Sequence, residues 1–409
     1  MKYKNEANIL VINCGSSSLK YRIIRMPGGK ELTAGEAVRV GTHTREPSAI
    51  HYWDATGKKS VTVEMPDHAA AFRSVISLLG RESKKHPELC YDCFAHRYVH
   101  PGAYFNKTTR IDKKALTKLK KTVSLAPIHN TISLNLISVC AKEFRKTPQY
   151  AVFDTAFHRT IPKELASYAL PEAMVKKYGV RKVGFHGISH RYIMEESCKF
   201  LARDAATQKI ISCHLGSGGS SVCAIRNGQS LNNSMGFTPL EGLMMNTRCG
   251  DLDIGVLFHV MAKNNMSPEE AEKVLNYKSG ILGVFNASSD MRDVAKQYCT
   301  DDKANLTFSM YVRRVRKYIA YYSLLLHKAD ILVFTDTLGI EMPALRQSIC
   351  EGLDCFGISL DEHKNNASIA GDAEITGKGS QTRVLAIPTN EEIMIARETY
   401  KEYCDDHRS

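Results

Sequence analysis

Residues 8–25, NILVINCGSSSLKYRIIR, are the segment that decides the fold of this 409-residue chain. Residues 9–12 are a continuous apolar run, residues 14–18 form a glycine- and serine-rich turn, and apolar and polar residues alternate after the turn. A period of two predicts a second strand, so the turn joins the two strands of a hairpin. In P-loop and dinucleotide-binding folds a helix follows the glycines, and the pattern therefore excludes both folds.

The same pattern returns in the second half of the chain, where residues 209–225 read KIISCHLGSGGSSVCAI. Two strand–turn–strand units indicate an internal duplication, although a repeat this short also arises between unrelated glycine-rich turns. Helix starts are predicted at Ser267 and Thr389, each followed by Glu three residues later, and Gly280 is the predicted stop of the first helix. An amphipathic helix at 313–328 precedes a buried strand at 332–335 and a turn at 336–339. Strands that alternate with helices predict an α/β protein.

Composition excludes several classes of protein. Hydrophobic residues make up 43% and charged residues 24%, which is typical of a globular chain. No apolar run is long enough to span a membrane, and the N-terminal residues do not resemble a signal peptide. The 12 cysteines are dispersed, with one C-x-x-C at Cys90 and Cys93, which favours reduced thiols. We therefore expect a cytoplasmic protein with no membrane partner.

The formal net charge of +12 indicates an anionic partner. The basic residues are scattered at helical spacing without interleaved aromatic residues, so we expect no nucleic acid to bind. The two glycine- and serine-rich turns are candidate phosphate cradles, because successive backbone N–H groups bind anions. One such turn alone is more typical of an ordinary loop, but two turns in matching context favour phosphate binding. Histidine and arginine segments at 96–100, 127–130, 154–158, 184–187 and 247–251 supply the positive donors that an anionic substrate needs.

These segments resemble the acetate kinase family, a branch of the actin-like ATPase and sugar-kinase superfamily. The matching stretches are NCGSSSLKY (13–21), HRYVH (96–100), LAPIHN (125–130), FDTAFH (153–158), GFHGISH (184–190), CHLGSGGSS (213–221), SMGFTPLEGLMMNTRCGD (234–251) and TNEEIMIARET (389–399). The resemblance implies an α/β fold with two duplicated actin-like, ribonuclease H-like domains around a central cleft. Residues 1–155 with 388–409 would form the N-terminal domain. Residues 156–387 would form the C-terminal domain, which carries the nucleotide or pyrophosphate side and the dimer contact.

The resemblance also implies a reaction, the reversible transfer of a phosphoryl group between acetate or acetyl phosphate and a phosphate donor or acceptor. Acetate is already an anion, so in-line transfer needs charge neutralisation rather than a general base. The implied metal is Mg²⁺, with Mn²⁺ as an alternative, and the implied assembly is a homodimer. The residues that match the family's catalytic groups are Arg97, Asp154, His186, Arg248 and His129.

Three further groups of residues match the family's binding sites. The apolar pocket for the methyl group of acetate, which favours acetate over propionate, corresponds to Val99, Ile128, Phe185 and Pro239. The phosphate-binding residues correspond to Asn13, Ser16, Ser18, Lys20, His214, Gly216, Gly218 and Gly219. The metal-binding residues correspond to Asn13, Asp154 and Glu391.

Residues 335–341 depart from the family's adenine-site loop, which reads threonine-alanine-glycine-isoleucine-glycine-glutamate-asparagine. Thr337 stands in place of the glycine that lies against the adenine, and Glu341 stands in place of the asparagine. A similar loop occurs in a branch of the family that uses pyrophosphate and orthophosphate, so we expect these in preference to ATP and ADP. The nucleotide or pyrophosphate loop would comprise Asp290, Met291, Arg292, Thr337, Leu338 and Gly339.

Three alternatives to the pyrophosphate enzyme remain open from the sequence. The match at residues 290–292 keeps a conventional ATP/ADP acetate kinase as the principal alternative. The altered loop is also compatible with drift at a tolerant surface segment. A relative that binds phosphate compounds without turnover is the third alternative, and the joint presence of the catalytic matches argues against it.

Overall fold

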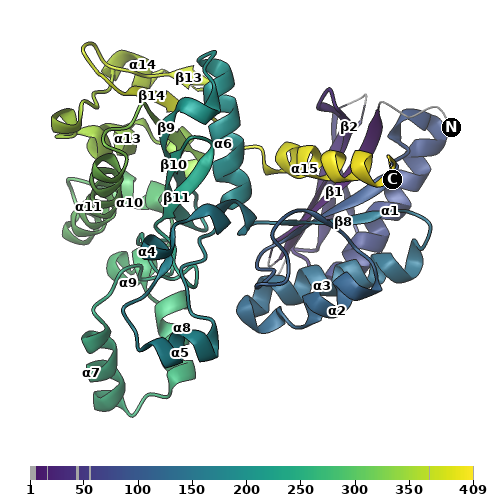
Figure 1. The fold of residues 1–409 in the computed structure, drawn as a ribbon, viewed down its shortest axis with the longest axis horizontal. Coiled ribbons are helices and arrows are strands. Elements are labelled where there is room, and N and C mark those ends of the chain that lie inside the picture. Colours follow the sequence, from purple (N-terminus) through teal and green to yellow (C-terminus); the bar gives the residue numbers. More distant parts are fainter. Residues whose placement is uncertain (1–5, 16, 43–45, 55–56, 368, 409) are drawn as a thin grey trace. The chain divides into compact units, whose positions relative to one another are not determined.

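The structure, a computed structural model, describes residues 6–15, 17–42, 46–54, 57–367 and 369–408, without the side chains of residues 127 and 128. The chain divides into two compact units, Met1–Ala156 with Asn390–Ser409, and Phe157–Thr389. Each unit contains one sheet with helices packed on it (Figure 1). This architecture confirms the predicted α/β class.

The first unit contains an eight-stranded sheet in the order β5-β4-β3-β2-β1-β6-β8-β7. Its strands are β1 (Ala7–Cys14), β2 (Ser18–Met26), β3 (Lys30–Val38), β4 (Ala49–Asp54), β5 (Gly57–Thr62), β6 (Cys93–Tyr98), β7 (Thr109–Arg110) and β8 (Gln149–Phe153). Its helices are α1 (His68–Lys85), α2 (Lys113–Lys120), α3 (Pro127–Glu143) and α15 (Glu391–Asp406). β1 and β2 form the predicted antiparallel hairpin, in which Asn13 lies opposite Lys20.

Strand β1 is an almost continuous apolar run because helices cover both faces of the sheet. Leu10 and Ile12 belong to the core that α1 and α3 complete. Ile9 and Val11 are equally buried, and the alternation of side chains along a strand turns them to the opposite face, where α15 packs on β1. β1, β6 and β8 are parallel, so their carboxyl ends lie at one edge of the sheet.

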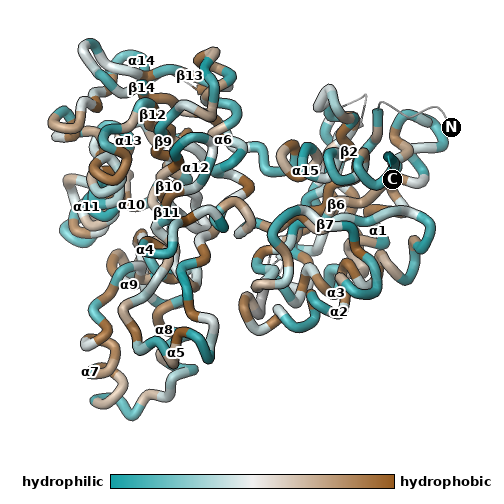
Figure 2. Tube along the Cα trace, viewed as in Figure 1, coloured by the Kyte–Doolittle hydropathy of each residue, from teal (hydrophilic) through white to brown (hydrophobic). Residues whose placement is uncertain are grey.

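The second unit contains a six-stranded sheet in the order β11-β10-β9-β12-β14-β13. Its strands are β9 (Lys209–Leu215), β10 (Ser220–Arg226), β11 (Gln229–Asn233), β12 (Ile331–Thr335), β13 (Ala373–Glu374) and β14 (Arg383–Ala386). Its helices are α4 (Lys163–Ala166), α5 (Glu172–Tyr178), α6 (Gly187–Phe200), α7 (Ile254–Asn264), α8 (Pro268–Tyr277), α9 (Gly280–Phe285), α10 (Met291–Gln297), α11 (Asp302–Leu325), α12 (Asp336–Glu341), α13 (Pro343–Cys350) and α14 (Glu362–Asn366). Hydrophobic residues are concentrated along its central strands (Figure 2).

The two sheets share one topology over five strands. The order β3-β2-β1-β6-β8 in the first corresponds to β11-β10-β9-β12-β14 in the second. In both, an antiparallel hairpin carries the glycine turn. The first hairpin strand pairs in parallel with one further strand (β6 or β12), and that strand pairs in parallel with the last (β8 or β14). The short sequence repeat therefore marks a duplicated supersecondary unit.

Four local predictions are wrong in detail. The helix predicted at 313–328 is α11, which begins at Asp302 and ends at Leu325. Asn390 rather than Thr389 caps α15, because its side chain accepts from Ile393 N at 3.1 Å while the Thr389 hydroxyl bonds Ser189 at 2.9 Å. The capping box at Ser267 is confirmed, but α8 ends at Tyr277 and Gly280 begins α9. The turn predicted at 336–339 is the helix α12.

The cysteines are free thiols, and seven of them are buried. Burial raises the pKa of Cys14 to about 12 and holds this thiol in its unreactive protonated form. In the described ranges, every helix is too short or too polar to cross a membrane.

Candidate active site

The first unit gathers its predicted site residues at the carboxyl edge of its parallel strands. Asn13 lies near the end of β1, Arg97 lies near the end of β6, and Asp154 follows β8 directly. The Asp154 backbone N–H donates to Tyr98 O at 3.0 Å and so continues the ladder beyond the strand. Ligands of open α/β sheets bind at this edge.

Arg97 is the centre of this group. Its Nη2 lies 3.0 Å from Asp154 Oδ2, and its Nε lies 3.9 Å from Glu391 Oε2. Burial alone would lower the pKa of the guanidinium, but the Glu391 and Asp154 carboxylates raise it above its usual value. The Asp154 side chain is 1% exposed, so this ion pair is shielded from solvent. The carboxylates therefore hold Arg97 charged and in one orientation.

Asn13 connects this ion pair to α15. Its Nδ2 donates to Glu392 Oε1 at 3.1 Å and to Glu391 Oε2 at 3.4 Å, while its Oδ1 accepts from Arg97 at 3.4 Å. Glu392 was not among the predicted residues, because nothing in a linear sequence pairs position 13 with position 392. The described residues contain no group of three or more His, Cys, Asp or Glu side chains able to hold a metal. Two carboxylates and an amide oxygen still suit a hard cation such as Mg²⁺, which keeps several waters.

The first glycine turn is partly described. Gly15 N donates to Ser18 O at 2.9 Å, and a side chain at Gly15 would contact Ser18 Oγ. Lys20 is exposed on β2, and Ser16 lies outside the described residues. His68 bonds Gly15 O at 3.0 Å, and burial lowers its pKa, so a neutral ring steadies the turn. The sequence carried no signal for this histidine.

The apolar pocket residues are divided between the two units. Val99 is buried directly after β6, and the residue that follows it is fixed because Asn130 bonds both the N–H and the C=O of His100. His129 lies half-buried on the same helix as Asn130, α3, and the Ile128 side chain is not described. In the second unit Phe185 is buried and Pro239 is half-buried.

The second glycine turn joins β9 to β10. Gly216 N donates to Gly219 O at 3.1 Å, and a Cβ on Gly216 would lie 2.3 Å from Asp336 Oδ2. Only glycine therefore fits at position 216. The Asp336 carboxylate also lies 3.0 Å from His214 Nε2. Burial would raise the pKa of Asp336, but His214 and the bonds from Thr337 lower it well below its usual value.

Gly219 lies between two predicted catalytic side chains. A Cβ built on it would be 3.5 Å from both His186 Nε2 and Arg248 Nη2. His186 adopts a left-handed backbone conformation (φ 56°) at the start of α6, and its Nδ1 bonds Ser221 Oγ at 2.9 Å. The turn, the imidazole and the guanidinium therefore meet around one backbone position, and Gly218 lies beside them because its carbonyl accepts from Arg248 Nη2 at 3.3 Å.

Arg248 differs from Arg97 in its partners. Its Nη1 donates to Pro239 O at 3.1 Å, and no carboxylate in the described part of the chain pairs with it. Burial lowers the pKa of Arg248, so its charge is desolvated and uncompensated. Such a group is stabilised by an incoming anion.

The loop that carries Arg248 depends on Gly280. A Cβ at this glycine (φ 63°) would lie 2.2 Å from Met245 O and 2.7 Å from Arg248 O. Ser279 N also donates to Thr247 O at 3.0 Å. The sequence signalled Gly280 only as a helix stop, and its role in close packing required the structure.

A buried network of serine and histidine side chains fixes the His186 ring. Ser221 Oγ bonds both His186 and His190, and His190 Nδ1 bonds Ser212 Oγ at 2.9 Å. Burial lowers the pKa of His190 far below its usual value, so its ring is neutral. His190 lies inside a recognised motif but was not predicted as a site residue.

Arg292, one of the predicted nucleotide or pyrophosphate residues, pairs with two carboxylates. Its guanidinium lies 2.7 Å from Asp290 Oδ2 and 2.9 Å from Glu341 Oε2. Met291 belongs to the hydrophobic core, and Leu338 and Gly339 of α12 are buried. Thr337 N–H donates to Asp336 Oδ1 at 2.7 Å at the start of α12. Residues 290–292 and the altered loop therefore share one ion-pair network.

Comparison with known proteins agrees with this geometry. Residues 8–397 match the acetokinase family. The acetate kinase of Treponema denticola is 43% identical over 96% of this chain and 98% of its own length. The structure of Porphyromonas gingivalis acetate kinase superimposes with a TM-score of 0.88 at 36% identity, covering 97% of this chain and 99% of that one. A propionate kinase from Francisella tularensis superimposes with a TM-score of 0.87 at 36% identity, covering 96% and 98% of the two chains.

These matches span nearly the whole chain, and they confirm the resemblance inferred from its motifs. The chain belongs to the acetokinase family and is a phosphotransferase whose acceptor is a carboxyl group.

Proposed function

We propose that this enzyme catalyses the reversible reaction of acetyl phosphate with ADP, which yields acetate and ATP. The names of its relatives support acetate as the acceptor and the conventional kinase reaction. The observation that carries the proposal is the uncompensated guanidinium of Arg248, which flanks Gly219 together with His186. A phosphoryl group in transfer is the anion for which such a site is suited.

Each proposed catalytic residue neutralises or orients charge. A carboxylate oxygen of acetate attacks the terminal phosphorus of ATP while the bond from that phosphorus to the bridging oxygen of ADP breaks in line. Arg248 and His186 donate to the phosphoryl oxygens, and Arg97, held by Asp154, donates to the acetate carboxylate. His129 is proposed as a further donor on the substrate side. No proton has to be removed, so Asp154 acts as a positioning residue.

The phosphate and metal roles complete the proposal. The first glycine turn, with Asn13, Ser16, Ser18 and Lys20, and the second, with His214, Gly216, Gly218 and Gly219, would cradle phosphate oxygens. Asp154, Glu391 and the amide oxygen of Asn13 would hold Mg²⁺, with Mn²⁺ as the alternative. The metal would supply charge neutralisation on the phosphate oxygens.

Acetate is the proposed substrate in preference to propionate. Val99, Ile128, Phe185 and Pro239 would enclose the methyl group. One extra methylene changes binding in such a pocket by about 1–3 kcal/mol. Propionate should therefore react measurably but more slowly, in keeping with a propionate kinase among the relatives.

Pyrophosphate is the second candidate, and the altered loop favours it. Asp336 places a carboxylate against Gly216 of the second glycine turn, and Glu341 neutralises Arg292. Both changes remove attraction for a nucleotide polyphosphate. In this variant of the reaction, acetate and pyrophosphate yield acetyl phosphate and orthophosphate.

A hydroxamate assay for acetyl phosphate, run with acetate and either ATP or pyrophosphate, distinguishes the candidates. Turnover with ATP and none with pyrophosphate supports the main proposal, and the opposite result supports the second. Absence of turnover with both donors, in protein whose circular dichroism shows a folded chain, would overturn both.

We further infer a cytoplasmic homodimer. The free cysteines are in keeping with a reducing compartment. Apolar side chains are exposed on and just before α7, among them Ile254 at 66% and Phe258 at 65%. The hydrophobic character of this helix is visible in Figure 2. Exposed apolar clusters of this kind mark interaction surfaces, and a second copy of the chain is the proposed partner.

A further inference from the structure

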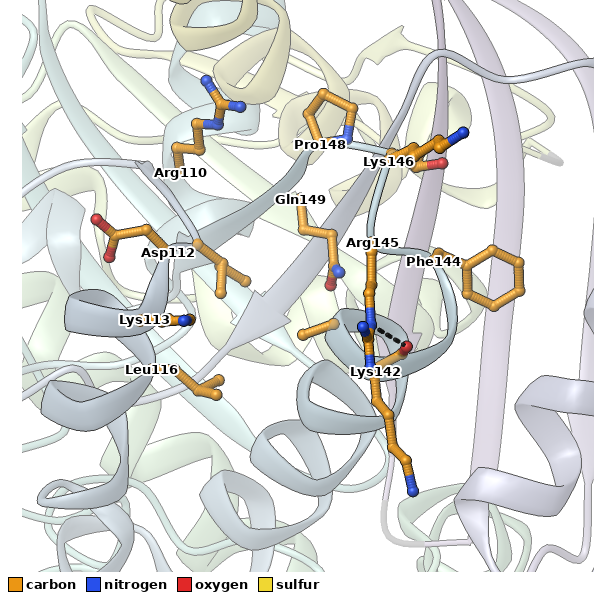
Figure 3. A pocket seen from close by; sticks show the side chains of 13 residues that line it. Arg110, Asp112, Lys113, Leu116, Lys142, Phe144, Arg145, Lys146, Pro148 and Gln149 are labelled. Carbon is orange, nitrogen blue, oxygen red and sulfur yellow. Dashed lines mark hydrogen bonds between the residues drawn. The ribbon is translucent and has the colours of Figure 1, made fainter.

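The first unit contains a cavity of about 680 Å³ that none of the proposed catalytic residues lines. It lies between β7, the start of α2, the end of α3 and the start of β8 (Figure 3). Gln149 is the first residue of β8, so the cavity lies at the amino edge of the parallel strands, whereas Arg97 and Asp154 lie at the carboxyl edge. Its volume is within the range of ligand-binding pockets, about 300–1,000 Å³.

The lining of this cavity is strongly basic. Its five cationic side chains, against the single carboxylate of Asp112, are Arg110, Lys113, Lys142, Arg145 and Lys146. The Asp112 carboxylate is already engaged in a hydrogen bond at the start of α2, where it accepts from Ala115 N at 2.6 Å.

Most of these cations have no acidic partner. Arg110 lies 3.7 Å from Asp406, but no described carboxylate pairs with Lys113, Lys142, Arg145 or Lys146. Arg145 Nε donates only to the Lys142 carbonyl, at 3.3 Å. The cavity therefore carries an excess of positive charge that an anion would neutralise.

A buried amide forms the floor of the cavity. Gln149 is 5% exposed, and Figure 3 shows its side chain in the middle of the lining residues, with Lys113 on one side and Arg145 on the other. Its Oε1 accepts from His96 Nε2 at 3.1 Å, and its amide nitrogen has no acceptor among the described residues. A fixed, unused N–H donor at the base of a basic cavity adds a hydrogen bond for an anion.

The remaining walls are apolar and rigid. Leu116 and Phe144 line the cavity beside the cations. Phe144 is held by the aromatic core, with its ring centroid 5.3 Å from that of Phe94. The start of β8 is anchored because Ile111 N donates to Gln149 O at 2.8 Å. A ligand with both phosphate groups and an apolar or aromatic part fits this combination better than inorganic phosphate alone.

We propose that this basic cavity is a second anion site, which binds an organic polyphosphate of the nucleotide class. The phosphates are bound by Lys113, Arg145 and the Gln149 amide, and the organic part lies against Leu116 and Phe144. The site does not depend on the phosphoryl partner used in catalysis.

Hydrogen exchange of the full chain, read by mass spectrometry, tests the proposal with ATP and with inorganic tripolyphosphate as probes. We expect both probes to slow exchange in residues 110–116 and 141–149, and ATP to do so at lower concentration. These segments are separate from the glycine turns at 13–20 and 214–220. Absence of ligand binding at the proposed active site would therefore be detected separately from absence of binding at the basic cavity.

A matched pair of double variants provides the control. Lys113→Gln with Arg145→Gln removes two charges from the cavity, and Lys120→Gln with Lys121→Gln removes two exposed charges outside it. The cavity variant should weaken protection of residues 141–149 by at least about tenfold in probe concentration, while the control should not. Equal protection in both variants, or no protection of these segments in the unmodified enzyme, would overturn the proposal.

Discussion

Arg97 and Asp154 form an ion pair of 3.0 Å in which the carboxylate is almost completely buried. The pair joins two neighbouring parallel strands at the edge where the proposed substrates bind. Breaking a buried pair by removing one partner is costly, because it leaves the other charge uncompensated. In this enzyme the second carboxylate, Glu391, limits that cost, since it lies 3.9 Å from Arg97 Nε.

Asp154→Asn should therefore lower activity more than stability. We expect kcat to fall by at least about tenfold because Arg97 loses its fixed orientation, with a loss of about 1–3 kcal/mol in the free energy of unfolding. Steady-state kinetics and urea denaturation measure the two effects. Asp406→Asn is the control, because this carboxylate accepts from Tyr150 at 2.7 Å far along α15 and should affect stability only. Equal kcat losses in the two variants would contradict a positioning role for Asp154.

Arg248→Ala should lower activity strongly without lowering stability. Its loss removes a donor to the transferring phosphoryl group, and we expect kcat to fall by about 10²–10³-fold. The free energy of unfolding should stay unchanged or rise, because burial lowers the pKa of Arg248 and no carboxylate compensates its charge.

Arg346→Ala is the matched control for this prediction. Arg346 is buried and donates to Gly339 O, Ile340 O and Asn365, so its removal should cost about 3 kcal/mol or more of stability. Thermal unfolding and kinetics on both variants test the contrast. An Arg248→Ala protein as unstable as the Arg346→Ala protein would show that Arg248 is structural.

Buried histidines predict a loss of stability in weak acid. Burial lowers the pKa of His96 and of His100 to about 4 in the folded chain, against about 6.5 when unfolded. Between these values the unfolded state binds more protons, so the free energy of unfolding falls as pH falls, by about 1.4 kcal/mol per pH unit for each ring. Between pH 6.5 and pH 5, each ring should account for a loss of about 1.5 kcal/mol, because the slope reaches its full value only well below pH 6.5.

Urea denaturation of the unmodified enzyme and of a His96→Phe variant, across this pH range, tests whether the buried ring causes the loss of stability. His96→Phe keeps the ring that stacks on Phe94 and removes the titrating group. Its stability should depend less steeply on pH, by about 1.4 kcal/mol per unit, even if it is lower at pH 7. A slope as steep as that of the unmodified enzyme would contradict the assignment.

The exposed face of α7 predicts the assembly state. Ile254→Asp with Phe258→Asp should convert the proposed homodimer to a monomer, because two charges would be buried without partners at the interface. Light scattering after size exclusion measures the mass. Leu170→Asp with Met174→Asp, at two exposed apolar residues on and just before α5, is the control and should leave the dimer intact. A monomeric unmodified protein would overturn the proposal directly.

The parts of this fold that the sequence predicted are those encoded by local periodicity. The alternation after Gly15 predicted the hairpin of β1 and β2, because a period of two is a property of the strand itself, and the apolar run after the second glycine turn predicted β10. Where two local signals competed, prediction failed. Thr389 and Asn390 are both good capping residues, and a contact of Thr389 with Ser189 decided between them.

The candidate site could be named from motifs as a set of residues, but its contacts could not. Motifs identified Arg97, Asp154 and Glu391, yet the partnership of Asn13 with Glu392 joins the two ends of the chain. Asp336 was expected in a turn, and only the structure shows that its left-handed backbone (φ 63°) turns the carboxylate toward His214. Such contacts depend on tertiary packing, which periodicity does not encode.

Glu341 gives the sharpest test of what the altered loop does. Its carboxylate lies 2.9 Å from Arg292 Nη1, at the position where the family has asparagine. Glu341→Asn would leave Arg292 paired with Asp290 alone and would remove one negative charge near the proposed nucleotide site. We expect the KM for ATP to fall by about threefold to tenfold with kcat little changed, since this contact concerns binding rather than transfer. Because Glu341 is half exposed, stability should change by no more than about 0.5 kcal/mol.

The matched control for Glu341 is Glu351→Asn, which breaks a similar ion pair, 3.0 Å from Arg316, outside the loop. It should leave the KM for ATP unchanged. Steady-state kinetics of both variants are measured with ATP and with pyrophosphate, each varied at saturating acetate. If Glu341→Asn leaves the ATP kinetics unchanged but weakens the use of pyrophosphate, the loop serves the smaller donor and the nucleotide proposal is wrong. If it alters neither donor, the substitutions in the loop have no part in choosing between them, and the choice must depend on the glycine turns and Asp336.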